Sequence, residues 1–207
     1  MVPVKRFTVA KSRLASGVDA ARKPELVAAM VADVLEAIGA ARSIERTIVV
    51  SQEPVAAELA AQAGAELIDD FDDSGHVAAA LAGIARAEEL GARCVAILPG
   101  DCRLLDPREL DKMLTGVPDS YVAVIPDRHG TGTNALVLAP PSAIVPSFGE
   151  GSKERHVEAA RAAGIPYAVE ELPSLGLDLD TPADIVALTT RVEMSGGAKR
   201  TAKALGI

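Results

Sequence analysis

The chain has 207 residues, a formal net charge of −8, and 49% apolar but only 2% aromatic residues. This length suits one α/β domain, and the acidic balance argues against general nucleic-acid binding, which needs a basic face. No apolar stretch approaches the length of a membrane span, no signal peptide is expected, and the two cysteines, Cys94 and Cys102, are predicted to be free thiols in a cytoplasmic protein.

The first half of the chain alternates strand-like and helix-like segments. Short apolar runs predict strands at 1–4, 47–50, 66–68 and 93–98, and longer Ala-rich segments predict helices at 24–38, 54–63 and 76–90. Pro24 and Pro54 stand in the first turn of their helices, where the missing N–H costs little. This alternation predicts an α/β fold, a mostly parallel, doubly wound sheet with helices on both faces.

The regular alternation of predicted strands and helices changes after residue 98. Further helices are predicted at 107–114, 152–163 and 182–194, and further strands at 121–125, 134–138, 167–172 and 175–180. The strands at 121–125 and 134–138 are joined by the loop 126–133. We interpret residues 1–207 as one domain, with a tail from about Ser195 that is expected to be flexible.

Three aspartates have the layout of a magnesium site. Asp101 follows the apolar run 94–100, and Asp178 and Asp180 lie where another strand should end. Asp178 and Asp180 are two residues apart, so they share one face of an extended strand. Magnesium takes a few carboxylates together with substrate phosphates. A turn or capping role is the alternative for each aspartate, but the three together favour a metal site and nucleotide chemistry.

Three loops have residues that suit anions. The segment 5–13 carries four cations within nine residues, directly after the first strand, as a triphosphate would need. The segment 126–136 has two glycines and two threonines that could leave backbone N–H groups accessible, and Arg128 adds charge. The segment 148–156 runs from a Gly-rich turn into a helix N-terminus. The alternatives are a solvated basic loop, an ordinary hairpin connection, and a helix simply capped by Ser152.

The histidines show no carboxylate pairing in the sequence. A catalytic role for His129 is disfavoured, and His76 and His156 are expected at the surface or at helix ends rather than as ligands. The acidic run 69–73 is expected to be a solvated loop.

Together these motifs resemble the guanylyltransferases of deazaflavin coenzyme F-420 biosynthesis, which act on 2-phospho-L-lactate or, in bacterial relatives, on phosphoenolpyruvate. The resemblance runs from Val2 to about Val192, and 127–136 is its most specific stretch. It implies the α/β fold of the nucleotidyltransferases, similar to that of sugar-nucleotide transferases. Two positions depart from the family: 74–79 lacks a Leu-Asn pair often found in the nucleobase-side loop, and Arg103 stands where relatives usually have proline.

The resemblance implies a role for each candidate residue. The GTP phosphates would contact Lys5, Lys11 and Arg13, and magnesium, with two ions expected, would be held by Asp101, Asp178 and Asp180. The phospho-acid would be bound by Thr133, Gly149, Ser152 and Arg128. Lys11 and Asp101 would be the catalytic groups. The acceptor phosphate would attack the α-phosphorus of GTP and release pyrophosphate without a general base. Phosphoenolpyruvate is favoured over phospholactate, and a homodimer is left open. The alternatives are a cytidylyl- or molybdopterin-type nucleotidyltransferase and a non-catalytic nucleotide-binding module.

Overall fold

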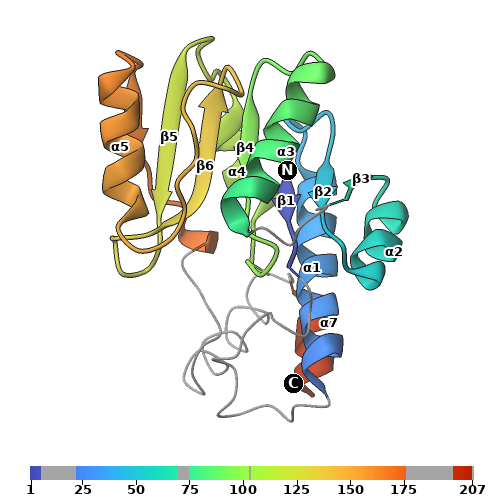
Figure 1. Cartoon of the computed structure of the whole chain (residues 1–207). Helices are drawn as coiled ribbons and strands as arrows, with labels where there is room; N and C mark the ends of the chain where they lie inside the picture. The colour runs from blue at the N-terminus through green and yellow to red at the C-terminus, as the bar shows by residue number, and fades with distance from the viewer. Residues whose placement is uncertain (6–21, 70–74, 103, 176–197, 207) are drawn as a thin grey trace.

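The computed structural model describes residues 1–5, 22–69, 75–102, 104–175 and 198–206 (Figure 1). The strands are β1 Val2–Pro3, β2 Ile48–Val50, β3 Glu66–Ile68, β4 Val95–Ile97, β5 Tyr121–Pro126, β6 Thr133–Ala139 and β7 Tyr167–Val169. The helices are α1 Lys23–Ala40, α2 Pro54–Gln62, α3 His76–Glu89, α4 Pro107–Leu114, α5 Ser152–Ala162 and α7 Lys199–Leu205, with a 3₁₀ turn, η3, at Pro173–Leu175. The helix predicted at 182–194 lies outside the described residues.

The strands follow the spatial order β3-β2-β1 and β4-β6-β5-β7. The two groups adjoin, because the Leu98 amide donates to the Met1 carbonyl (3.0 Å) and the Met1 nitrogen donates to the Ala96 carbonyl (2.6 Å). Among the described strands, β6 runs antiparallel to its neighbours β4 and β5, whereas β1, β2 and β3 pair in parallel, as do β5 and β7. The predicted mostly parallel sheet is therefore confirmed.

Two apolar clusters lie on opposite faces of the sheet, because successive strand residues point to opposite sides. In β5, Val122 and Val124 pack in a cluster with α3 and α5, whereas Ala123 and Ile125 pack in a cluster with α1, α2 and α4. Both clusters consist mainly of Ala, Val, Leu and Ile. The predicted doubly wound arrangement, with helices on both faces, follows from this alternation (Figure 1).

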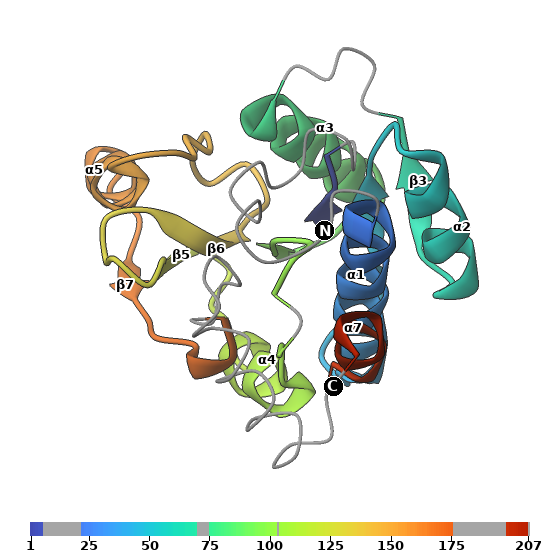
Figure 2. The same ribbon diagram turned by 90° about the horizontal axis from the view of Figure 1, so that it is seen from below.

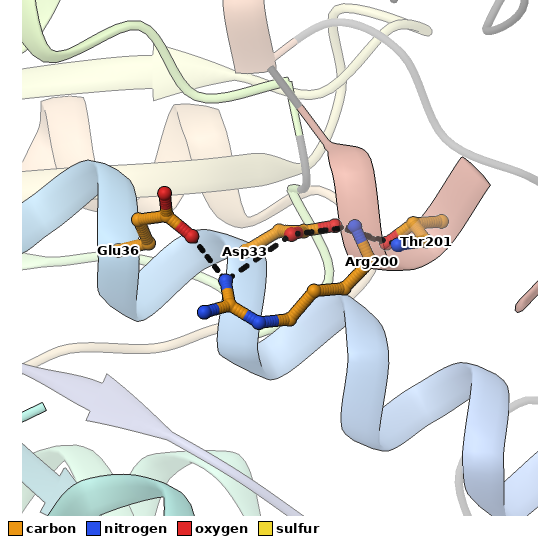
Figure 3. Close-up of polar contacts among 4 residues, drawn as sticks. All are labelled: Asp33, Glu36, Arg200 and Thr201. Atoms are coloured by element: carbon orange, nitrogen blue, oxygen red, sulfur yellow. Dashed lines mark hydrogen bonds and ion pairs between the residues drawn. The ribbon is translucent and has the colours of Figure 1, made fainter. Parts of the chain in front are cut away.

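Helix α7 lies within the C-terminal tail and packs beside α1 (Figures 1 and 2). Asp33 of α1, which is buried, caps α7 from outside the helix: its carboxylate accepts from the Thr201 amide (2.8 Å), the Thr201 hydroxyl (2.7 Å) and the Arg200 amide (3.2 Å). The Arg200 guanidinium contacts Asp33 and Glu36 (Figure 3). The sequence pattern does not predict this helix, because its cap acceptor stands more than 160 residues away.

In the part of the chain that the structure describes, no helix is long and apolar enough to cross a membrane. Cys94 and Cys102 are free cysteines, as predicted, and Cys102 is buried.

Candidate active site at the carboxyl edge of the sheet

The candidate residues that the structure describes gather at one edge of the sheet. Lys5 follows the end of β1, and Asp101 follows the end of β4. Because β6 runs against β4 and β5, its first residue, Thr133, lies at the same edge as their last residues. Ligands of open α/β sheets bind at the carboxyl ends of the parallel strands. The edge is therefore the place where a substrate is expected.

A cavity of about 250 Å³ opens between the ends of β1 and β4. Lys5, His76 and Asp101 supply its charged and titratable groups, and its other walls come from the loops after β1 and β4 and from α1. A larger cavity, about 480 Å³, lies at the opposite edge, where residues before β2 and β4 line it. We take the smaller cavity as part of the candidate site, because it stands at the carboxyl edge.

Lys5 and Asp101, two of the predicted site residues, both line this cavity. His76, the first residue of α3, is half-buried beside them. Burial lowers the pKa of His76, the positive charge of Lys5 lowers it further, and Asp101 opposes both effects. Because the His76 imidazole is then mostly neutral, the charges that line this cavity are those of Lys5 and Asp101. Lys11, Arg13, Asp178 and Asp180 lie outside the described residues.

A second group of polar side chains surrounds Thr133. The Ser152 hydroxyl, at the start of α5, donates to Thr133 Oγ1 (3.2 Å). His156, four residues further along the same helix, places Nδ1 2.9 Å from that oxygen. Ser152 and His156 are fully buried, whereas Thr133 is partly exposed. The two candidates Thr133 and Ser152, 19 residues apart in the chain, are thus brought together as expected.

Helix α5 is not capped by the Ser152 side chain. Its N-cap is Gly151, with φ at 68°, and Ser152 is the first helical residue. The amides of Ser152 and Lys153 donate to the carbonyls of Gly149 (3.1 Å) and Thr131 (3.1 Å). The capping alternative for Ser152 is therefore wrong, and the expectation of a helix N-terminus with several unpaired amides is wrong for these two.

The loop between β5 and β6 is organised by Asp127. Oδ1 of Asp127 accepts from the amides of His129 (3.2 Å) and Thr131 (3.1 Å), and the Asp127 carbonyl accepts from the Gly130 amide (3.0 Å). The expectation that this loop leaves its amides accessible is wrong for these three, because Asp127 already engages them. Arg128 is exposed on the same loop, and its Nε donates to Nε2 of His129 (3.2 Å).

The loop 147–151 is held by Arg155 of α5. The Arg155 guanidinium donates to the carbonyls of Ser147 (2.7 Å) and Glu150 (2.5 Å). Gly149 is exposed in this loop with φ at 114°, and the space that a side chain would occupy there is open. Within the described residues, no acceptor is found for the Gly149 amide. A ligand can therefore approach this backbone, as predicted for Gly149.

Phe148 connects the two polar groups. Its ring contacts His156 edge-on, with centroids 5.3 Å apart, and it contacts His76 in the same way at 5.3 Å. His76 lines the cavity that contains Lys5 and Asp101. The ring of Phe148, which precedes Gly149 in its loop, is therefore packed between His156 of the Thr133 group and His76 of the cavity wall.

Leu175, the last described residue before Asp178 and Asp180, lies beside these groups. The Leu175 carbonyl, the last described group before those aspartates, accepts from Asn134 Nδ2 (2.9 Å) and lies 3.8 Å from Cys102 Sγ. Asn134 and Cys102 directly follow Thr133 and Asp101 in the sequence. Leu175 thus lies next to both parts of the site.

The fold and the strand-edge site define a nucleotidyltransferase-like α/β protein. A putative nucleotide-diphospho-sugar transferase from Desulfovibrio desulfuricans superposes with a TM-score of 0.75 at 16% identity, over 99% of this chain and 94% of that one. The CMP:2-keto-3-deoxy-manno-octonic acid synthetase complexed with CTP superposes with a TM-score of 0.61 at 16% identity, over 94% of this chain and 97% of that one. At these identities the likeness concerns the fold.

The sequence comparison is more specific. Residues 1–205 match the family described as "Guanylyl transferase CofC like", and the chain belongs to this family. The phosphoenolpyruvate guanylyltransferase of Conexibacter woesei is 42% identical over 205 residues, 97% of this chain and 92% of that protein. The protein of the same name from Sphaerobacter thermophilus is 37% identical over 188 residues, 91% of this chain and 90% of that protein. The resemblance inferred from the motifs is confirmed.

The predicted position of His156 is wrong. This residue of α5 was expected at the surface or at a helix end, but its side chain is fully buried and contacts Thr133. A signal was present: Ser152 and His156 are four residues apart on a predicted helix, so they share one face.

Proposed function

We propose that this chain is a guanylyltransferase that joins GTP to phosphoenolpyruvate and releases pyrophosphate, as a step of coenzyme F-420 biosynthesis. One observation carries the proposal: in a chain whose relatives bear this name, Thr133 and Ser152 pair at the strand edge that also holds Lys5 and Asp101. The pair and the Gly149 backbone suit the anionic oxygens of a small phospho-acid.

The proposed reaction requires little proton transfer by side chains. A phosphate oxygen of the acceptor attacks the α-phosphorus of GTP, the new P–O bond forms, and the bond to the β-phosphate oxygen breaks. The nucleophile is already ionised near neutral pH, so no strong general base is needed. The side chains contribute mainly by positioning the two substrates and by neutralising their charge.

The nucleotide would lie over the cavity at the ends of β1 and β4. Lys5 borders this cavity, and Lys11 and Arg13 follow Lys5 in the chain. These three residues would supply the cations for the triphosphate. The acceptor would lie at Thr133, Gly149 and Ser152, with Arg128 on the adjoining loop. The Phe148 contacts to His156 and His76 support a short path between the two substrates.

Asp101, Asp178 and Asp180 would hold magnesium. Asp101 is half-buried at the end of β4, and the fixed Leu175 carbonyl stands three residues before Asp178, a chain reach of about 10 Å. Carboxylate oxygens are the ligands that magnesium prefers. The bound metal would neutralise phosphate charge and activate the leaving group.

An acceptor and nucleotide panel tests the proposal. The full chain is incubated with magnesium, with GTP, CTP or ATP, and with phosphoenolpyruvate, 2-phospho-L-lactate or inorganic phosphate. We expect pyrophosphate release and a product of the mass of guanylylated phosphoenolpyruvate, with GTP strongly preferred. Turnover with CTP but not GTP, or no pyrophosphate in any combination, would refute the proposal.

A further inference from the structure

A buried imidazole stands directly behind the Thr133 hydroxyl. His156 Nδ1 lies 2.9 Å from Thr133 Oγ1, and on the other side of the ring the Ser147 amide donates to His156 Nε2 (2.8 Å). The side chain of His156, a residue of α5, is completely buried, so it does not contact solvent. Its two ring nitrogens therefore connect a site hydroxyl to the backbone of the loop that contains Gly149.

The partners of His156 fix the location of its proton. A backbone amide can only donate, so Nε2 must be the unprotonated acceptor. A neutral imidazole then carries its proton on Nδ1, and Nδ1–H donates to Thr133 Oγ1. Burial, with a smaller effect from the Arg155 charge, lowers the pKa of His156 to about 4, which keeps the ring neutral near pH 7.

The direction of the bonds at Thr133 follows. Its oxygen accepts from His156 Nδ1 and from the Ser152 hydroxyl, and a hydroxyl oxygen has two acceptor positions. Both positions are engaged by buried groups. The hydrogen of the Thr133 hydroxyl is therefore left to point toward the partly exposed side, where a ligand would be.

We propose that His156 is a positioning residue that makes the Thr133 hydroxyl a one-way hydrogen-bond donor and so selects acceptors with an anionic oxygen at this point. The inference rests on the proposed function, which it deepens by assigning the selectivity of the acceptor subsite. A carboxylate or phosphate oxygen gains a charge-assisted hydrogen bond from Thr133. A ligand that presents its own O–H or N–H there meets a second donor and leaves both unsatisfied.

Two amide variants separate this role from simple anchoring of the loop. The amide atoms of Asn stand as far along the side chain as Nδ1, and those of Gln as far as Nε2. His156→Asn can therefore still donate to Thr133 but loses Ser147, whereas His156→Gln can still accept from Ser147 but loses the donor to Thr133. KM and Kd are measured for phosphoenolpyruvate, with GTP affinity and urea unfolding as controls.

We expect His156→Gln to weaken phosphoenolpyruvate binding by about 10-fold, because the charge-assisted hydrogen bond from Thr133 loses its fixed orientation, and His156→Asn to weaken it clearly less. GTP affinity should change little in both variants. The reverse order, with His156→Gln near wild type and His156→Asn impaired, would overturn the proposal in favour of loop anchoring.

A double-mutant cycle decides the case in which both variants are impaired. If His156 acts through Thr133, His156→Gln should cost little further affinity in a Thr133→Val background. Additive losses would overturn the proposal. The imidazole nitrogen spectrum of the wild-type protein gives a reading independent of turnover: a proton on Nδ1 is expected, and a proton on Nε2 would overturn the inference. Absence of turnover with GTP and phosphoenolpyruvate would count against the proposed function alone, because calorimetric Kd values for phosphoenolpyruvate still order the variants.

Discussion

Acid should destabilise this protein through His156. Burial holds the pKa of its imidazole at about 4 in the folded state, below the ordinary 6.5 expected in the unfolded chain. Between these values the unfolded state binds a proton that the folded state does not, so stability falls as pH decreases through this window. At 1.36 kcal/mol per pH unit, the full loss is ~3 kcal/mol, reached below about pH 4.

The structure explains why protonation is costly. A second ring proton would sit on Nε2, where the Ser147 amide already donates, so two donors would face each other. The Arg155 guanidinium, which holds the same loop, adds a nearby positive charge. The Thr133 and Ser152 hydroxyls carry no charge that could stabilise the imidazolium.

Urea unfolding at several pH values measures the effect. The free energy of unfolding is compared between wild type and His156→Gln, so groups common to both proteins cancel. The difference between the two should shrink by ~2 kcal/mol from about pH 7 to about pH 4.5, because only wild type carries the buried titrating ring. His129→Gln, which removes an exposed histidine, is the matched control and should follow wild type. A wild-type minus His156→Gln difference that is constant with pH would refute the reasoning.

Three further predictions test the rest of the site and the fold. Asp101→Asn should lower turnover at saturating GTP and magnesium by at least ~100-fold, or ~2.7 kcal/mol of transition-state stabilisation, while urea unfolding still shows a folded protein; a rate near wild type would remove Asp101 from the metal site. Gly149→Val should cost ~1–3 kcal/mol in urea unfolding, because φ is 114°, and should raise the acceptor KM; wild-type values of both would show that neither the backbone conformation nor the open space matters. Asp33→Ala should cost ~2 kcal/mol in urea unfolding, since it leaves the Thr201 amide and hydroxyl without their acceptor, and Asp33→Asn should cost less; equal costs would contradict the capping role.

Much of the fold could be predicted from the sequence because its signals are local. Apolar runs such as 47–50 gave the strands, and Pro54 and Pro107 marked helix starts that the structure places at the same residues. The order of elements then sufficed for a parallel, two-faced sheet. Helix α7 could not be predicted in this way, because its stability depends on Asp33, a residue distant in the chain.

The polar groups of the site were harder to predict, because the sequence does not show which backbone groups are already engaged within the protein. The Gly-rich loops of the sequence indicated free backbone amides. In the structure, however, Asp127 accepts hydrogen bonds from three amides of its own loop, and the Thr131 carbonyl accepts one from the Lys153 amide. The pairing of Thr133 with Ser152 came from the family resemblance rather than from spacing. His156 would have been found by asking which residue shares the Ser152 face of the helix.

In the proposed site, these contacts would shift the basis of acceptor recognition from backbone amides to side chains. A Gly-rich anion site binds through amides, which any compact anion can share. Here several of those amides are engaged within the protein, and the Thr133 hydroxyl, whose oxygen accepts from His156 and Ser152, is the proposed donor instead. A single oriented donor discriminates by the direction of its hydrogen bond, because a mismatched ligand leaves two donors unsatisfied in a partly buried place. Selectivity among small phospho-acids should therefore be altered by changing the neighbours of Thr133, His156 first, without touching the nucleotide side of the site.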